Sequence, residues 1–187
     1  MKVIGSVIAR LGSKRLPYKN ILPFEGVPLV VLGIQKLKAC HSVNDIIVST
    51  ESELIARIAA GHGAHILRRP AELAQDDTPS IPVFQHIMEH FEGNVHVNYN
   101  INFPLCDPAV IDRAVELAVE NGESLSVPYA VWAQTATCLK DYKDPMTITA
   151  YKFDDDRAGS TDIHTEEELL EVYRTAQGPL PEWDSTI

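Results

Sequence analysis

The sequence has few cysteines and no long hydrophobic segment. Its three cysteines, Cys40, Cys106 and Cys138, include no closely spaced pair, so we expect free thiols in a reducing cytoplasm rather than a disulfide framework. No apolar run is long enough to span a bilayer. The first residues lack the apolar region and small-residue cleavage site of a signal peptide. These absences predict a cytoplasmic protein that does not act in a membrane.

Basic residues are also scarce. The chain has 16 Lys and Arg against 26 Asp and Glu, which gives a formal net charge of −10. A nucleic-acid-binding protein normally presents a basic face, so this balance argues against a nucleic-acid partner. The length of 187 residues is enough to bury one sizeable core. We therefore expect a single domain over residues 1–187.

Short apolar runs alternate with helical patterns along the chain. Strands are predicted at 2–9, 45–50, 64–67, 95–101 and 125–127, and helices at 27–39, 52–60, 80–91, 107–121 and 165–176. This alternation predicts an α/β fold with a mostly parallel sheet and helices on both faces. The pattern is weaker from 129 to 160, where one or two strands or a hairpin are expected. The tail after Gly178 is predicted to be irregular.

A cluster of basic residues follows the first predicted strand. Arg10, Lys14, Arg15 and Lys19 lie within residues 8–20 of this otherwise acidic chain. Gly12 and Ser13 would allow a tight turn and offer backbone N–H groups, as in anion-binding loops. Parallel sheets bind ligands beyond the carboxyl ends of their strands. The loop is thus a candidate triphosphate site, although basic clusters are more often solvated surface.

The same stretch, IARLGSKRLPYKN at 8–20, resembles the nucleotide-binding signature of the cytidylyltransferases that activate acidic sugars, the acylneuraminate and 3-deoxy-manno-octulosonate enzymes. Four further blocks resemble the family in order and spacing: 47–53, 69–80, 104–114 and 162–169. The resemblance implies a Rossmann-like, glycosyltransferase-A-type three-layer sandwich. It also implies the reaction of CTP with a sugar acid to give a CMP-sugar and pyrophosphate, for surface polysaccharide synthesis, commonly by a homodimer.

The resemblance assigns roles by position. It implies that the catalytic cations are Arg10, Lys14 and Lys19. It also implies that the nucleotide is held by Arg10, Gly12, Ser13, Lys14, Lys19, Asn20, Arg69, Thr78 and Ser80, the last three beside the base and ribose. Cations suit this chemistry because attack on an α-phosphate requires neutralised charge and a stabilised pyrophosphate.

The chain departs from the family pattern where Mg²⁺ is expected. Asn102 stands where octulosonate-type enzymes have an Asp, and His164 replaces the second Asp of the C-terminal block. The metal ligands expected here, Asp162, His164 and Asn102, are a weaker set for a hard cation. The acidic triple Asp154–Asp156 is a candidate source of another carboxylate, although such a triple is more often a solvated turn.

The region that carries sugar-binding and dimer-forming elements in relatives, 129–160 here, is also shorter. Two interpretations stay open at this point. The chain is either an active enzyme with a modified metal site, or a catalytically impaired nucleotide-binding relative that serves as a binding or regulatory protein.

Overall fold

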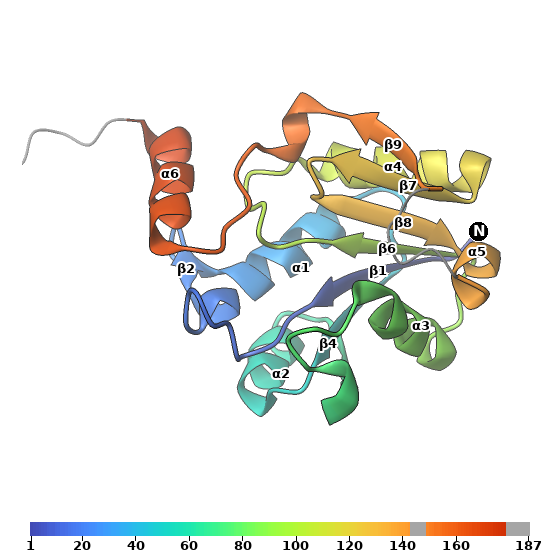
Figure 1. Cartoon of the computed structure of the whole chain (residues 1–187), viewed down its shortest axis with the longest axis horizontal. Coiled ribbons are helices and arrows are strands. Elements are labelled where there is room, and N and C mark those ends of the chain that lie inside the picture. Colours follow the sequence, from blue (N-terminus) through green and yellow to red (C-terminus); the bar gives the residue numbers. More distant parts are fainter. Residues whose placement is uncertain (143–148, 179–187) are drawn as a thin grey trace, which may run out of the picture.

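The computed structural model of the chain describes residues 1–142 and 149–178, and its centre is a seven-stranded sheet (Figure 1). The strand order is β5-β4-β1-β6-β8-β7-β9. Only β8 runs antiparallel to its neighbours, β6 and β7, so the sheet is mostly parallel, as predicted. The strands are β1 (Val3–Ile8), β4 (Asp45–Thr50), β5 (His65–Arg68), β6 (Val95–Tyr99), β7 (Glu123–Val127), β8 (Val131–Thr135) and β9 (Tyr151–Asp154).

The central strands form because both of their faces are buried. Every residue from Val3 to Val7 is buried in β1, and β4 is buried from Ile46 to Thr50. Such strands read as continuous apolar runs rather than alternating ones. Because β1 pairs in parallel with both β4 and β6, the carboxyl ends of all three strands lie at one edge of the sheet.

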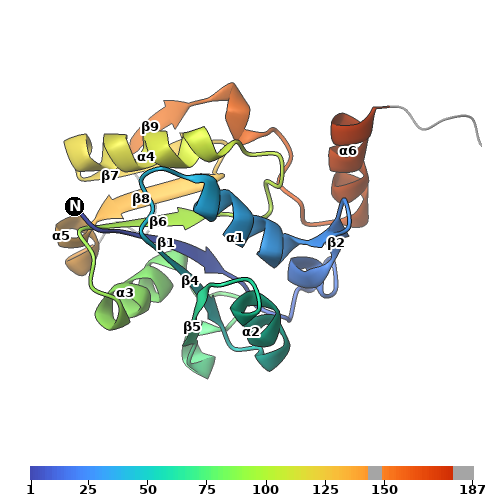
Figure 2. The same ribbon diagram turned by 180° about the vertical axis from the view of Figure 1, so that it is seen from behind.

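Helices cover both faces of the sheet and complete the expected three layers (Figures 1 and 2). Figure 2 shows α1 (Leu29–Ala39), α2 (Glu53–Ala60) and α4 (Pro108–Asn121) on one face. The other face carries α3 (Ser80–His90) and α5 (Ala136–Lys140). Within the described residues, no helix is both long and apolar enough to cross a membrane.

Helix α1 packs against the sheet at very short range. A Cβ placed on Gly33 would come within 2.5 Å of the Ile101 side chain and 3.1 Å of the Val7 side chain. Glycine is therefore required at this point of closest approach. This contact seats the helix that follows the basic loop, and so helps to fix the geometry of the adjacent strand ends.

A two-strand hairpin, β2 (Pro23–Phe24) and β3 (Val27–Pro28), precedes α1. Its turn residues Glu25 and Gly26 both have positive φ, 50° and 81°, as tight hairpin turns require. The prediction that the helix already begins at residue 27 is therefore wrong. Residues 27 and 28 pair with β2, and α1 begins at Leu29.

The last helix, α6 (Glu166–Gln177), lies outside the three layers and packs on this hairpin (Figure 1). The Tyr173 hydroxyl donates to the Pro23 carbonyl at 2.8 Å and accepts from the Glu25 N–H at 3.1 Å. The Tyr173 ring also lies 4.8 Å from the Phe24 ring. These contacts anchor the C-terminal block beside the segment that follows the basic loop.

Several local predictions are confirmed. The helices predicted at 165–176 and 107–121 are present as α6 and α4; Thr165 and Glu168 form a capping box on α6, and Asp107 caps α4. The weakly patterned region contributes β8 and β9, but also α5, which was not predicted and which Thr135 caps. The three cysteines are free. Residues 143–148 and the tail after Gly178 lie outside the described residues.

Candidate functional site

A pocket of about 500 Å³ lies at the carboxyl ends of β1 and β6. Ile8, Asn98 and Asn100 come from the ends of these two strands and contribute to its lining. Five basic side chains line it as well: Arg10, Lys14, Arg15, Lys19 and Arg69. The basic loop therefore faces a cavity in the place that a parallel sheet offers to a ligand.

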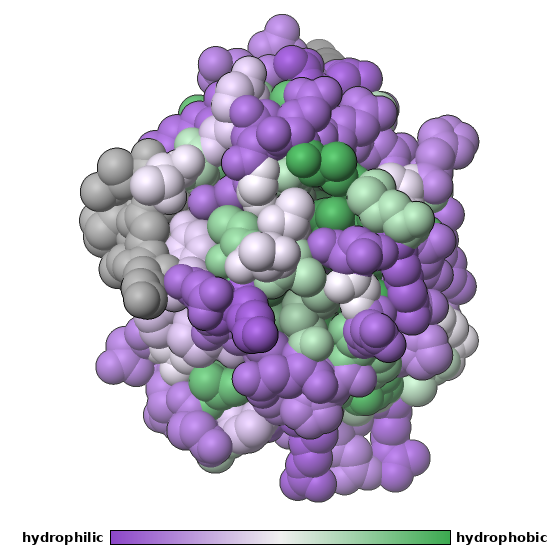
Figure 3. All heavy atoms as spheres, turned by 90° about the vertical axis from the view of Figure 1, so that its right-hand side faces the viewer, coloured by the Kyte–Doolittle hydropathy of each residue, from purple (hydrophilic) through white to green (hydrophobic). Residues whose placement is uncertain are grey.

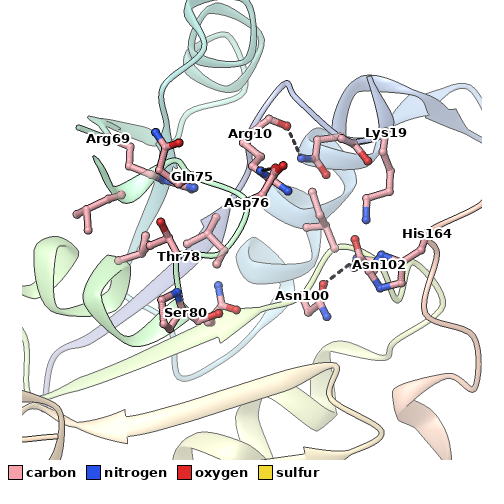
Figure 4. Close-up of a pocket in the computed structure, with 18 of the residues that line it drawn as sticks. Arg10, Lys19, Arg69, Gln75, Asp76, Thr78, Ser80, Asn100, Asn102 and His164 are labelled. Carbon is pink, nitrogen blue, oxygen red and sulfur yellow. Dashed lines mark hydrogen bonds and ion pairs between the residues drawn. The ribbon is translucent and has the colours of Figure 1, made fainter. Parts of the chain in front are cut away.

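Two of these cations share one acidic partner. Arg10 and Lys14 each pair with a carboxylate oxygen of Asp76, which lies between the 3₁₀ turn η2 (Ala71–Leu73) and α3 (Figure 4). Hydrogen bonds from Lys14 and Arg10 hold the pKa of Asp76 below its usual value. Sequence reasoning assigned no role to Asp76. The structure shows that Arg10 and Lys14 already form a site for one oxyanion.

Lys19 is the most deeply placed cation of the basic loop. It is 7% exposed, in the 3₁₀ turn η1 (Lys19–Ile21), and its Nζ donates to the Ile163 carbonyl at 2.9 Å. Burial lowers the pKa of Lys19 to about 8; Asp162 opposes this shift, and Arg15 adds to it. Lys19 thus connects the basic loop to the C-terminal block and presents a partly desolvated cation to the pocket.

The rest of the loop is held by local contacts. Asn20 is buried and its Nδ2 donates to the Arg10 carbonyl at 2.7 Å. The Ser13 N–H donates to the Leu11 carbonyl at 3.0 Å, so an amide that we expected to face an anion is used in a turn. Ser13 still lines the pocket, whereas Gly12 lines a neighbouring hollow instead.

Arg69, Thr78 and Ser80 form the opposite flank of the pocket (Figure 4). The Arg69 guanidinium is buried and donates to Ser49 of β4, to Oγ at 3.2 Å and to the carbonyl at 2.5 Å. Burial lowers the pKa of Arg69 to about 10, which leaves it charged at neutral pH. The Thr78 hydroxyl donates to the Glu72 carbonyl at 3.2 Å, which folds this loop over the flank.

The structure brings the three predicted metal ligands together. The Ile163 N–H donates to the Asn102 carbonyl at 3.0 Å, and His164 Nε2 lies 3.0 Å from Asp162 Oδ1. Asn102 and His164 line the pocket, but Asp162 does not. Apart from the His164 contact, Asp162 Oδ1 has no hydrogen-bond partner among the described residues. This oxygen is the carboxylate atom that a metal ion beside the pocket would use.

The acidic triple does not supply a further ligand. Asp155 is paired with Arg157 at 2.8 Å and with Arg113 at 3.4 Å. Hydrogen bonds from Arg157 lower the pKa of Asp155 to about 2. Within residues 1–142 and 149–178 no three His, Cys, Asp or Glu residues are grouped to hold a metal. A metal bound here would need amide and substrate oxygens besides Asp162.

The floor of the pocket is neutral, and sequence reasoning did not assign it. Asn98, Asn100 and Tyr129 line it without any charge. The Asn100 Nδ2 donates to the Tyr129 carbonyl at 3.0 Å, while its Oδ1 accepts from the Asn102 N–H at 3.2 Å (Figure 4). The signal was present: asparagines alternate with larger apolar residues from Asn98 to Asn102 at the end of a predicted strand.

A second hollow, of about 740 Å³, lies between α3 and α5. It opens near the end of the molecule that Figure 3 shows, where polar side chains surround small apolar areas. Its lining includes one lysine, Lys140, together with Glu89 and Glu92. Because it lies away from the carboxyl ends of the parallel strands, we place the functional site in the first pocket.

Comparison with known proteins gives a consistent result. A family model described as cytidylyltransferase matches residues 4–176. The chain is 34% identical over 117 residues to N-acylneuraminate cytidylyltransferase A of Danio rerio, covering 62% of this chain and 27% of that protein. It is 33% identical over 122 residues to the 3-deoxy-manno-octulosonate cytidylyltransferase of Chlorobaculum parvum, covering 65% and 48%. The chain thus spans less than half of each of these relatives.

Solved structures show the same fold. The chain superimposes on CMP:2-keto-3-deoxy-manno-octonic acid synthetase complexed with CTP with a TM-score of 0.79 and 13% identity, covering 94% of this chain and 98% of that one. A cytidylyltransferase from Leptospira borgpetersenii gives a TM-score of 0.71 and 18% identity, covering 98% of this chain and 100% of that one. The expected Rossmann-like nucleotidyltransferase fold is confirmed.

Proposed function

Because the chain belongs to the cytidylyltransferase family, we propose that it transfers a cytidylyl group from CTP to an acidic sugar and releases pyrophosphate. The observation that carries this proposal is the convergence of Arg10, Lys14, Lys19 and Arg69 on one pocket at the strand ends. In a chain of net charge −10, such a cluster is a specific site for a polyanion.

The proposed reaction uses these cations directly. A hydroxyl oxygen of the sugar acid loses its proton to water and forms a bond to the α-phosphorus of CTP, the bond to the bridging oxygen breaks, and pyrophosphate leaves with that electron pair. Lys19 would neutralise charge that develops in this step, because it is the buried cation beside the C-terminal block. Arg10 and Lys14 would exchange Asp76 for phosphate oxygens. Gly12, Ser13 and Asn20 would shape the loop, and Arg69, Thr78 and Ser80 would flank the nucleoside.

Mg²⁺ is the cofactor that we propose for this site. Magnesium is usually bound by one or two carboxylates together with substrate phosphates and water. Asp162 supplies one carboxylate, with an oxygen that makes no hydrogen bond among the described residues, and the Asn102 amide adds a neutral oxygen. His164 contacts Asp162 at 3.0 Å and is the weakest of the three as a ligand for a hard cation. Bound Mg²⁺ would neutralise triphosphate charge.

The wider setting is part of the same proposal. The acceptor is an acidic sugar for surface polysaccharide synthesis, the protein works in the cytoplasm, and it forms a homodimer, as the family resemblance implies. The two curated relatives described above are named for N-acylneuraminate and 3-deoxy-manno-octulosonate, so these two sugar acids are the first candidates for the acceptor.

Pyrophosphate release tests the proposal. The purified chain is incubated with CTP, Mg²⁺ and either an N-acylneuraminate or 3-deoxy-manno-octulosonate, and calorimetry measures CTP binding with and without Mg²⁺. Release that depends on the sugar acid supports the transferase. CTP binding without release for either acid would instead favour the catalytically impaired, nucleotide-binding alternative. A chain that neither binds CTP nor releases pyrophosphate would contradict both.

A further inference from the structure

Tyr129 is held in the pocket floor from three sides. Its hydroxyl donates to Asn98 Oδ1 at 3.3 Å, and its carbonyl accepts from Asn100 Nδ2 at 3.0 Å. Its ring packs edge-on against Trp132, with the ring centres 5.7 Å apart. A side chain fixed at its hydroxyl, its backbone and its ring presents its oxygen to the pocket in one defined position.

The orientation of the Asn98 amide is determined by its neighbours. Asn98 is buried, and its Nδ2 lies 3.2 Å from the Ser6 carbonyl and 3.2 Å from Ser6 Oγ. A carbonyl oxygen can only accept a hydrogen bond. The amide nitrogen must therefore face Ser6, and the amide oxygen must face Tyr129. Because that oxygen is itself only an acceptor, the Tyr129 hydroxyl has to be the donor.

The same direction continues beneath the pocket. Burial lowers the pKa of His96 to about 4, so the ring is neutral and carries one proton. Gln134 Oε1 lies 3.2 Å from His96 Nδ1 and can only accept, so this proton lies on Nδ1. His96 Nε2 therefore accepts from Ser6 Oγ, 2.9 Å away, which itself accepts from Asn98. The buried chain thus runs in one direction, from Tyr129 through Asn98, Ser6 and His96 to Gln134.

This direction decides what Tyr129 can offer a ligand. Its only proton is committed to Asn98, so its oxygen can accept a hydrogen bond but cannot donate one. Ser80, the first residue of α3, brings a second hydroxyl to the same pocket. We propose that Tyr129 is a specificity residue whose oxygen, together with Ser80, accepts a hydrogen bond from a ribose hydroxyl of the bound nucleotide.

The distribution of pocket residues favours the ribose as the donor. The phosphates are assigned to Arg10, Lys14 and Lys19, and the apolar side chains Leu73 and Val83 suit a base. On the side of the pocket away from the basic loop, the neutral hydroxyls of Tyr129, Ser80 and Thr78 suit a group with several hydroxyls, and the Thr78 proton is already donated to the Glu72 carbonyl. The inference rests on the proposed function only in requiring that the pocket takes a ribonucleotide, whichever base it carries.

Tyr129→Phe tests the inference by calorimetry, with no need for turnover. The variant and the original protein are titrated with CTP, 2′-deoxy-CTP and 3′-deoxy-CTP. Loss of one hydrogen bond should weaken CTP binding by about threefold to tenfold. The analogue that lacks the contacted hydroxyl should bind both proteins equally, because it has no donor for Tyr129 to accept. Its identity shows which hydroxyl is involved.

Tyr173→Phe is the matched control, because it removes a phenol hydroxyl that bonds only within the hairpin region. It should lower the melting temperature without changing any nucleotide affinity. Circular dichroism and thermal melting show whether Tyr129→Phe folds. Trp132→Phe loosens the ring contact, keeps the Tyr129 oxygen and removes the Nε1 hydrogen bond to buried Glu123. This second variant should be less stable than the original protein but should retain the discrimination between CTP and the deoxy analogue.

Two results would overturn the inference. One is unchanged CTP affinity in Tyr129→Phe, and the other is an equal loss for CTP and both deoxy analogues. If CTP does not bind, ATP, GTP and UTP are titrated in its place, and failure of all four ribonucleotides also overturns it. Absence of pyrophosphate release with a sugar acid counts against the proposed function alone, because binding is measured here.

Discussion

The basic loop and the neutral floor of the pocket differ in how their side chains are held. On the basic loop, the Lys14 side chain is 79% exposed and pairs with Asp76, whereas Asn98 in the floor is 1% exposed and lies within a chain of hydrogen bonds. Exposed charges act over about 8–10 Å at ordinary salt and are readily screened. Buried neutral hydrogen bonds act only at contact. The loop thus attracts a polyanion, and the floor determines its placement.

The basic loop and the floor also differ in the interactions that their side chains make when no ligand is bound. Two cations of the loop, Arg10 and Lys14, are balanced by the acidic side chain of Asp76, so a triphosphate that binds them must exchange one ion pair for another. The floor satisfies its polar groups internally and has nothing to exchange. Changes on the loop should therefore alter affinity with salt and pH, whereas changes in the floor should alter selectivity.

Removing the buried cation should produce the largest effect. Lys19→Met keeps a side chain of similar length but removes its positive charge and its hydrogen bond to the Ile163 carbonyl. Loss of one preorganised group that stabilises transition-state charge costs about 10²–10³-fold in kcat. Pyrophosphate release under saturating CTP measures this. Lys14→Met is the matched control: its side chain is 79% exposed, so it should mainly raise KM. Equal losses in the two variants would contradict the distinction.

A double variant of the predicted metal ligands tests the metal site. Asn102→Asp combined with His164→Asp restores two carboxylates beside Asp162. Because Mg²⁺ prefers charged oxygen ligands, we expect the Mg²⁺ concentration at half-maximal turnover to fall by about tenfold, with higher turnover. Without Mg²⁺ the same variant should bind CTP more weakly, since two negative charges then face the triphosphate. A gain in turnover with Mg²⁺ and a loss of CTP affinity without it distinguish metal binding from a general change in the pocket.

The control for the metal test is His90→Asp, which adds a carboxylate beside the second hollow, away from the strand ends. It should leave the Mg²⁺ dependence unchanged. An unaltered Mg²⁺ requirement in the double variant would show that Asn102 and His164 are not where the metal binds.

Lys19 also predicts a pH dependence in which binding and stability change in opposite directions. Its folded pKa is lowered by burial to about 8, against 10.5 for an ordinary lysine. Between these values the unfolded chain binds more protons, so the free energy of unfolding should rise with pH. Nucleotide binding requires the charged form and should fall by up to about tenfold per pH unit above about pH 8.

Calorimetric titrations and urea unfolding from pH 7 to 10 measure the two trends. Lys19→Met should remove both of them. A falling affinity that persists in this variant would assign the titration to another group, such as the nucleotide itself.

Most of the fold could be predicted because the central elements carry local signals. The strand at 45–50 matches β4 residue for residue, and Thr165 with Glu168 marks the start of α6. The hairpin was missed because Val27 and Pro28 fit a helical apolar pattern, while the turn depends on positive φ at Glu25 and Gly26. Helix α5 was missed because five residues show too little periodicity for a helix prediction.

The candidate site divides in the same way. The cations were predictable because a charge cluster after a strand is visible in the sequence. Asp76 was not, because its role arises when a loop more than 60 residues away folds beside Arg10. The role of Tyr129 depends on the side-chain orientations of Asn98 and His96 on β6 and of Ser6 on β1. No linear pattern encodes those orientations.

The smallest expected effect concerns the acidic partner of the loop. Asp76→Asn removes the carboxylate that Arg10 and Lys14 share and keeps nearly the same shape. Since exposed ion pairs are weak and screened, CTP affinity should rise by no more than about fivefold at low salt. The gain should shrink as salt increases. Titrations at low and high salt measure both effects.

Asp77→Asn separates pairing from net charge. Asp77 follows Asp76 directly, and Asp77→Asn removes the same negative charge as Asp76→Asn. Asp77 forms no ion pair within residues 1–142 and 149–178. If Asp76 competes with phosphate for the two cations, Asp76→Asn should gain more than Asp77→Asn, and inorganic pyrophosphate should show the same order. Equal gains would mean that general repulsion, rather than exchange of an ion pair, limits binding. In that case the pairing of Arg10 and Lys14 with Asp76 would not affect nucleotide binding. The basic loop and the floor would then differ only in the exposure of their side chains.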